Sequence, residues 1–110
     1  METPVVPIIN VQRLYEAIEK KEDFILLDVR TPREFEKGKI SGSINLPVDN
    51  IGERVGTIIP DKAKTVYVYC LSGNRSTIAV SQMVRLGYKK VFDVKNGLLA
   101  WRIANLPVFS

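Results

Sequence analysis

The sequence predicts an α/β protein in which helices cover both faces of a parallel sheet. Five short apolar segments alternate with segments of helical periodicity, which is the order of parallel strands joined by crossover helices. One of them, Phe24–Leu27, is continuously apolar, as in a central strand buried on both sides. The 110 residues contain no linker-like or repetitive stretch, so we expect a single domain over residues 1–110.

The first part of the chain predicts a strand, a helix and the central strand, in that order. Residues 5–9 form an apolar run typical of a strand. Asn10 is then a suitable N-cap, and the apolar residues at 11, 14, 15 and 18 form one stripe along an amphipathic helix. The central strand at 24–27 follows this helix.

A second helix is predicted at Thr31, which can act as N-cap with a proline after it and Glu34 completing a capping box. We expect this helix to end at Gly38 in the left-handed conformation. A short strand follows at 43–46. Residues 48–59 have a weaker helical pattern because two glycines interrupt it.

The second half of the chain repeats the order of strand and helix around Cys70. The β-branched and aromatic residues at 66–69 predict a buried strand. The next helix is predicted to end at Gly87 in a Schellman motif. A short strand at 91–92 and a last helical segment at 97–104 complete the pattern.

Cys70 is the only cysteine, and it lies where the strand at 66–69 passes into a helix. Backbone N–H groups and the positive end of the helix dipole point at a side chain in such a turn, and both favour the reactive thiolate over the thiol. The chain contains no histidine, so the usual general base is missing. The sequence therefore predicts Cys70 as a nucleophile that backbone dipoles and nearby cations activate.

The loop after Cys70 predicts an anion-binding cup. Gly73 and Asn74 tolerate the backbone conformations that turn successive N–H groups inward. Arg75 lies near a helix start, where a cation is unfavourable, so we expect it to have a partner: Asp28, Glu34 or an anionic substrate. The candidate loop residues are Leu71, Ser72, Gly73, Asn74, Arg75 and Ser76.

Charged residues follow other predicted strands and should share the edge of the sheet that carries Cys70. Asp28 and Arg30 follow one strand, and Asp93 follows another. The carboxyl ends of parallel strands meet at one edge, which is where ligands bind in such folds. Glu34 is explained equally well by its capping box and by a role in holding the loop.

Composition excludes several classes of function. A single cysteine leaves no internal disulfide and no multi-cysteine metal site. The net charge of +4 comes from scattered lysines and arginines, which argues against nucleic-acid binding but favours small anionic substrates. No apolar run approaches the ~20 residues that span a membrane, and the N-terminus lacks a signal-peptide pattern, so we expect a cytoplasmic protein.

Four ordered motifs resemble those of single-domain rhodaneses, which are thiosulfate sulfurtransferase-like proteins. They are Asp28–Phe35 (DVRTPREF), Gly38–Pro47 (GKISGSINLP), Cys70–Ser76 (CLSGNRS) and Asn96–Trp101 (NGLLAW). The resemblance covers nearly the whole chain. It implies a rhodanese-like α/β fold whose five-stranded, mostly parallel sheet is flanked by helices on both faces.

The resemblance also implies an activity and roles for individual residues. Cys70 would carry a persulfide, taking sulfur from thiosulfate or a related anionic donor and passing it to cyanide or a thiol. The backbone amides of the loop up to Arg75 would hold the persulfide. Arg75 and Arg30 would help to bind the donor, and Asp28 and Glu34 would anchor the loop or the arginine. No metal or organic cofactor is implied, and we expect a monomer or a weak homodimer.

Two positions depart from the pattern of the family. Lys39 stands where the family often has histidine, and that histidine is not generally the catalytic base. Asn96 stands where the family often has the first glycine of a pair, which predicts an altered turn near the edge of the site.

Two other functions fit parts of the sequence. A non-catalytic rhodanese-like module would bind a partner, although such modules most simply lose the cysteine or its loop, and both are kept here. A cysteine-dependent phosphatase uses a similar loop, but it usually places five residues between cysteine and arginine. Here four residues separate Cys70 from Arg75, and Tyr69 replaces the customary histidine before the cysteine.

Overall fold

The structure is a computed structural model that describes residues 6–110, and its centre is a five-stranded sheet. The strands lie in the order β1-β5-β4-β2-β3, and every neighbouring pair is parallel. This confirms the predicted fold class. The strands are β1 (Ile8–Ile9), β2 (Ile25–Asp28), β3 (Ile44–Asn45), β4 (Thr65–Tyr69) and β5 (Lys90–Val94).

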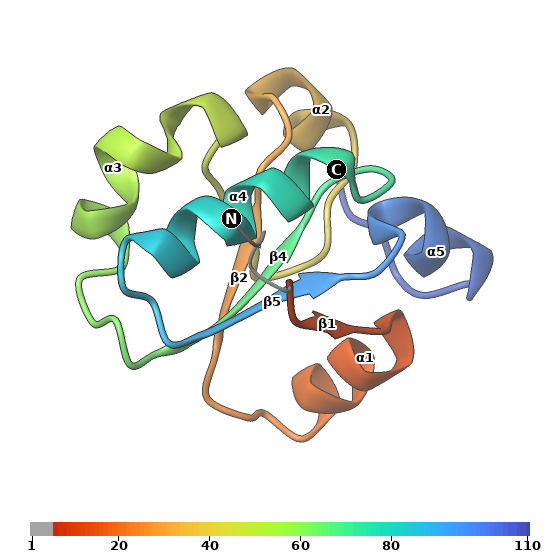
Figure 1. The fold of residues 1–110 in the computed structure, drawn as a ribbon. Coiled ribbons are helices and arrows are strands. Elements are labelled where there is room, and N and C mark those ends of the chain that lie inside the picture. Colours follow the sequence, from red (N-terminus) through yellow and green to blue (C-terminus); the bar gives the residue numbers. More distant parts are fainter. Residues whose placement is uncertain (1–5) are drawn as a thin grey trace.

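Helices cover both faces of this sheet (Figure 1). The helical elements are α1 (Val11–Glu19), α2 (Pro32–Lys37), the 3-10 turn η1 (Val48–Asn50), α3 (Ile51–Ile58), α4 (Asn74–Arg85) and α5 (Gly97–Ile103). One apolar cluster packs α3 and α4 against the sheet, and a second packs α1 and α5 against the other face. None of the described helices is long and apolar enough to cross a membrane.

The predicted helix ends at Asn10, Thr31 and Gly87 are confirmed. The Asn10 side chain accepts a hydrogen bond of 2.8 Å from the Arg13 N–H. Thr31 and Glu34 form both hydrogen bonds of the capping box. Gly87 has a φ of 99°, and the N–H after it donates across the end of α4 at 3.1 Å, as in a Schellman motif. These ends are set by local backbone chemistry, which is why the sequence predicts them.

The end of α2 differs from the prediction. Gly38 is extended, with a φ of 166°, rather than left-handed. Its carbonyl accepts a 2.6 Å hydrogen bond from Arg30 Nη2, and the chain continues directly to a bridge between Lys39 and Phe109. The extended Gly38 thus connects α2 to this bridge, with its carbonyl bound to an arginine eight residues earlier.

Strand boundaries also differ from the predicted ones. Asp28 ends β2 and Asp93 lies within β5, whereas both were expected after their strands. The predicted first strand is observed at 8–9, and its first residue, Val5, lies outside the described residues.

The register brings three strand ends to one edge of the sheet. Asp28 pairs with Tyr69, the residue before Cys70, across β2 and β4. On the other side of β4, Val68 pairs with Asp93. Cys70 therefore emerges between the ends of β2 and β5, at the edge where ligands bind in such folds.

The start of α5 holds the chain at Cys70 by a close backbone approach. The N–H groups of Leu98 and Leu99 donate to the carbonyls of Cys70 and Leu71 at 2.9 and 3.0 Å. Gly97 has a φ of 51°, and a Cβ there would overlap the Cys70 carbonyl and lie 2.9 Å from Leu71 O. Asn96, which departs from the family pattern, also has a positive φ of 59°, a conformation that asparagine tolerates.

The Gly97 approach predicts a large loss of stability on substitution. We expect Gly97→Ala to lower the free energy of unfolding by about 2 to 4 kcal/mol, because the methyl group meets backbone atoms and the φ is unfavourable. Gly56→Ala is the matched control, since a Cβ at Gly56 meets nothing within 4 Å. That helical substitution should raise stability by about 0.5 to 1 kcal/mol. Urea unfolding checks both; equal stability of Gly97→Ala and wild type would contradict the close approach.

Candidate active site

The Cys70 sulfur lies at the base of a loop that curls around it. Cys70 Sγ accepts hydrogen bonds from the backbone N–H groups of Gly73, at 3.1 Å, and Ser76, at 3.4 Å. Gly73 has a φ of 113° and precedes the first turn of α4, which has no other side-chain cap. The sulfur therefore caps α4, where the helix dipole favours negative charge. Only 1% of Cys70 is exposed.

A hydroxyl group completes the surroundings of the sulfur. Ser76 Oγ lies 3.3 Å from Cys70 Sγ and accepts a hydrogen bond from the thiol. The Ser76 hydroxyl itself donates to the Gly73 carbonyl at 3.2 Å, and the Thr77 hydroxyl donates to the same carbonyl at 2.7 Å. Ser76 is fully buried, so this hydroxyl belongs to the interior of the cup.

The other loop side chains point away from the sulfur. Leu71 packs against the cluster that contains α1 and α5. Ser72 and Asn74 are exposed. The loop therefore surrounds Cys70 Sγ mainly with backbone groups, and these three side chains are free to face solvent or a neighbouring element.

Arg75 and Glu34 form the ion pair that connects the loop to α2. The two side chains meet in a bidentate arrangement with distances of 2.6 and 3.0 Å. The Arg75 hydrogen bond is the main cause that lowers the Glu34 pKa to about 2, with the Thr31 backbone contributing in the same direction. Glu34 thus serves both as the capping residue of α2 and as the partner of Arg75.

Asp28 and Arg30 form a separate, buried pair. Their exposed fractions are 0% and 4%, and Arg30 Nη2 lies 2.6 Å from Asp28 Oδ2. The same nitrogen donates to the Gly38 carbonyl at 2.6 Å. Asp28 therefore holds Arg30 rather than Arg75. With its guanidinium bound to Asp28 and to the Gly38 carbonyl in the interior, Arg30 joins the end of β2 to the end of α2.

Asp93 is a buried polar residue. The sequence predicts it at this edge of the sheet, but not as one of the site residues. It is 5% exposed, and its strand packs beneath α4. A carboxylate inside the apolar run of β5, after Val91 and Phe92, is the signal that could have identified it.

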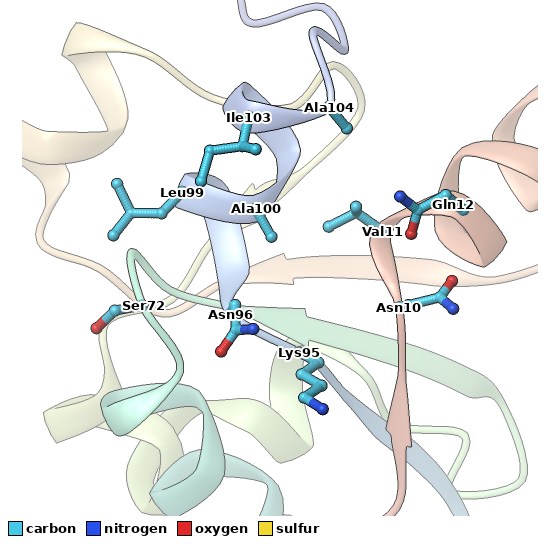
Figure 2. A pocket seen from close by; sticks show the side chains of 10 residues that line it. All are labelled: Asn10, Val11, Gln12, Ser72, Lys95, Asn96, Leu99, Ala100, Ile103 and Ala104. Carbon is cyan, nitrogen blue, oxygen red and sulfur yellow. The ribbon is translucent and has the colours of Figure 1, made fainter.

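A cleft of about 630 Å³ lies beside the loop, within the range of small-molecule sites. Figure 2 shows Ser72 and Leu99 at one end and Asn10 and Gln12 at the other. Among the described residues, Lys95 is the only charged one in its lining, which also includes Val11, Asn96, Ala100, Ile103 and Ala104. Among residues 6–110, no group of three or more metal-binding side chains could hold a metal ion.

The Arg75–Glu34 pair predicts a pH dependence of stability. Because its folded-state pKa lies below the ordinary 4.5, ionised Glu34 stabilises the fold above that pH, and this contribution is lost as pH falls from 4.5 toward about 2. Both partners are about one-third exposed, so we expect about 1 kcal/mol after solvent screening. Urea unfolding from neutral to low pH should show this loss in wild type but not in Glu34→Gln, which can keep the capping box.

Glu36→Gln is the control for this prediction, since Glu36 is an exposed residue of the same helix. The Glu36→Gln variant should show the same pH dependence of unfolding free energy as wild type. A Glu34→Gln curve parallel to that of wild type would show that the pair contributes nothing to stability.

Comparisons with known proteins agree with this geometry. A family model described as a rhodanese-like domain matches residues 10–104. A protein named sulfurtransferase from Allochromatium vinosum is 34% identical over 102 residues, which are 93% of this chain and 94% of that protein. The thiosulfate sulfurtransferase PspE of Escherichia coli is 38% identical over 65 residues, 59% of this chain and 62% of that protein.

Solved structures give the same result. A rhodanese-related protein from Thermoplasma volcanium superposes with a TM-score of 0.83 at 36% identity, covering 94% of this chain and 97% of that chain. A protein from Rhodopseudomonas palustris described as a possible tyrosine phosphatase has a TM-score of 0.85 at 26% identity, covering 94% and 85%. Sequence motifs, fold and relatives therefore agree: the chain belongs to the rhodanese-like family.

Proposed function

We propose that this protein is a sulfurtransferase that moves a sulfane sulfur from thiosulfate, or a related anionic donor, to cyanide or a thiol. The observation that carries the proposal is the Cys70 sulfur held by two backbone N–H groups at the start of α4. Such donors stabilise an anionic sulfur without a neighbouring base. The sulfurtransferase names among the relatives support the same reaction class.

The reaction has two halves. The Cys70 thiolate attacks the outer sulfur of thiosulfate, the sulfur–sulfur bond of the donor breaks, and sulfite leaves with the bonding electron pair. The acceptor then attacks the outer sulfur of the Cys70 persulfide and releases the Cys70 thiolate. Covalent catalysis of this kind divides the transfer into two displacements at sulfur.

Arg75 is the group that we propose for attracting the donor. Its side chain is one-third exposed, and the residue belongs to the first turn of the same helix as Ser76. The net charge of +4 adds a weak general attraction for anions. Since only 1% of Cys70 is exposed, the loop backbone that surrounds the sulfur must shift for a donor to reach it.

The cleft beside the loop is the space that we propose for the acceptor. It begins at Ser72, two residues from Cys70, and it combines an apolar lining with the positive charge of Lys95. An acceptor with an apolar body and a negative group fits this lining. One domain over residues 1–110, a monomer or weak homodimer, and a cytoplasmic location remain predictions.

Persulfide formation tests the proposal directly. After treatment with thiosulfate, mass spectrometry of the folded protein should show one added sulfur on Cys70. Cys70→Ser removes the nucleophile at nearly constant volume, so thiosulfate:cyanide transfer should fall by about a thousandfold or more while the thermal unfolding curve is retained.

The two alternative functions, a binding module and a phosphatase, predict different results. A folded wild-type protein that neither forms the persulfide nor turns over would be a binding module. Hydrolysis of an aryl phosphate that depends on Cys70 would instead identify a phosphatase. Either result would overturn sulfur transfer as the function.

Arg75→Gln tests the proposed donor contact. Loss of a charged hydrogen bond to the anion should lower kcat/KM for thiosulfate about tenfold, mainly through KM. The double variant with Glu34→Gln removes the carboxylate that would otherwise be left unpaired, and it should show the same defect. Arg33→Gln, an exposed arginine on α2, is the control and should match wild type. Unchanged KM in both Arg75 variants would contradict the role.

A further inference from the structure

Asp93 is a buried carboxylate for which the proposed reaction has no use. It lies in β5, paired with Val68 of β4 and with Ile8 of β1, on the side of the sheet that α4 covers. Its exposed fraction is 5%, and its Oδ1 has no hydrogen-bond partner among the described residues. An unpartnered carboxylate oxygen in the interior is costly, so its presence needs an explanation.

Helix α4 packs on β5, and its Ser76 and Thr77 hydroxyl groups are near enough to Asp93 to affect its pKa. In the structure both Ser76 and Thr77 donate to the Gly73 carbonyl, which leaves Asp93 Oδ1 without a donor. Burial is the larger effect on the Asp93 pKa and raises it above its ordinary value. The two hydroxyl groups act in the opposite direction and lower it. A buried carboxylic acid with a raised pKa is suited to hold a proton at higher pH than usual.

Ser76 connects this carboxylate to the reacting sulfur. Its Oγ lies 3.3 Å from Cys70 Sγ, on the donor side of the thiol. If the Ser76 hydroxyl turns from the Gly73 carbonyl to Asp93, that carbonyl still has its 2.7 Å hydrogen bond from Thr77. Such a turn would leave the Gly73 carbonyl paired, and it would give Asp93 Oδ1 the donor that it lacks.

We propose that Asp93 is the proton acceptor of Cys70 and that the Ser76 hydroxyl bridges the two. The thiol proton passes from Cys70 Sγ to Ser76 Oγ, while the Ser76 hydroxyl proton passes to Asp93 Oδ1. Sγ becomes a thiolate and Asp93 becomes a neutral carboxylic acid. The total charge is unchanged, and Asp93 now donates to Ser76 Oγ while Ser76 donates to the sulfur.

This proton transfer rests on the proposed function, and it specifies where the Cys70 thiol proton is held during sulfur transfer. While Cys70 carries the anionic persulfide, the thiol proton stays on Asp93. After the acceptor removes the outer sulfur, the Cys70 thiolate takes the proton back through Ser76. A buried thiol thereby exchanges its proton within the site, in a chain that has no histidine to do so.

Among residues 6–110, no other charged side chain takes this place on the elements packed around Asp93, and Arg85 lies exposed in the last turn of α4. Arg75 of α4 is bound to Glu34. On β5 itself, Lys90 is exposed at the opposite end of the strand, and Lys95, which follows the strand, lines the cleft. The register partners of Asp93 in β1 and β4 are apolar.

The pH dependence of Cys70 alkylation by iodoacetamide tests the inference without a sulfur donor. Cys70 is the only cysteine, so the rate reports this thiol alone. Two groups that share one proton titrate in two macroscopic steps. We expect the wild-type rate to rise in two steps with pH. Asp93→Asn mimics the neutral acid, so its rate should rise in one step, at a pH between the two.

Asp49→Asn is the matched control, since Asp49 is an exposed aspartate on η1, and it should keep both steps. A single step in wild type, or two unchanged steps in Asp93→Asn, would overturn the inference. The wild-type profile decides the question even if Asp93→Asn fails to fold.

Infrared difference spectra of the thiosulfate-treated protein give a second readout. The persulfide form at neutral pH should show the carbonyl band of a protonated carboxylic acid, and Asp93→Asn should lack it. A persulfide seen by mass spectrometry without this band would overturn the proton assignment but not sulfur transfer. Absence of the persulfide would instead refute the proposed function, and the alkylation profile would still test Asp93.

Discussion

The close approach of α5 to the backbone of Cys70 is the constraint on which the site depends. The carbonyls of Cys70 and Leu71 accept hydrogen bonds from the first turn of α5, and only a glycine at 97 leaves room for them. On the other side, the first turn of α4 donates to the Cys70 sulfur. The residue is therefore held by two helices at once, its carbonyl by one and its side chain by the other.

Two arginine–carboxylate pairs connect the segments around the site. The pair of Asp28 and Arg30 is buried and joins the end of β2 to the end of α2. That junction positions Glu34, which reaches Arg75 in the loop, 41 residues away in sequence. Losing one partner of the buried pair would leave an uncompensated charge inside, whereas the exposed pair contributes more to orientation than to stability.

The chemistry of the site follows from its lack of imidazole. Backbone N–H groups supply the positive potential around Cys70 Sγ, and the Ser76 hydroxyl accepts a hydrogen bond from the thiol. The group that we propose takes up the thiol proton is therefore a buried carboxylate, Asp93, and burial raises its pKa above the ordinary value.

The sequence by itself determined the fold class, the caps at Asn10 and Thr31 and the position of Cys70 between strand and helix, because these depend on local periodicity and on neighbouring residues. Tertiary structure decided which carboxylate meets which arginine, since Asp28 and Glu34 were equal candidates for Arg75. It also decided the extended backbone at Gly38 and the burial of Asp93 beneath α4. These features depend on strand register and on contacts between distant segments, which no local pattern encodes.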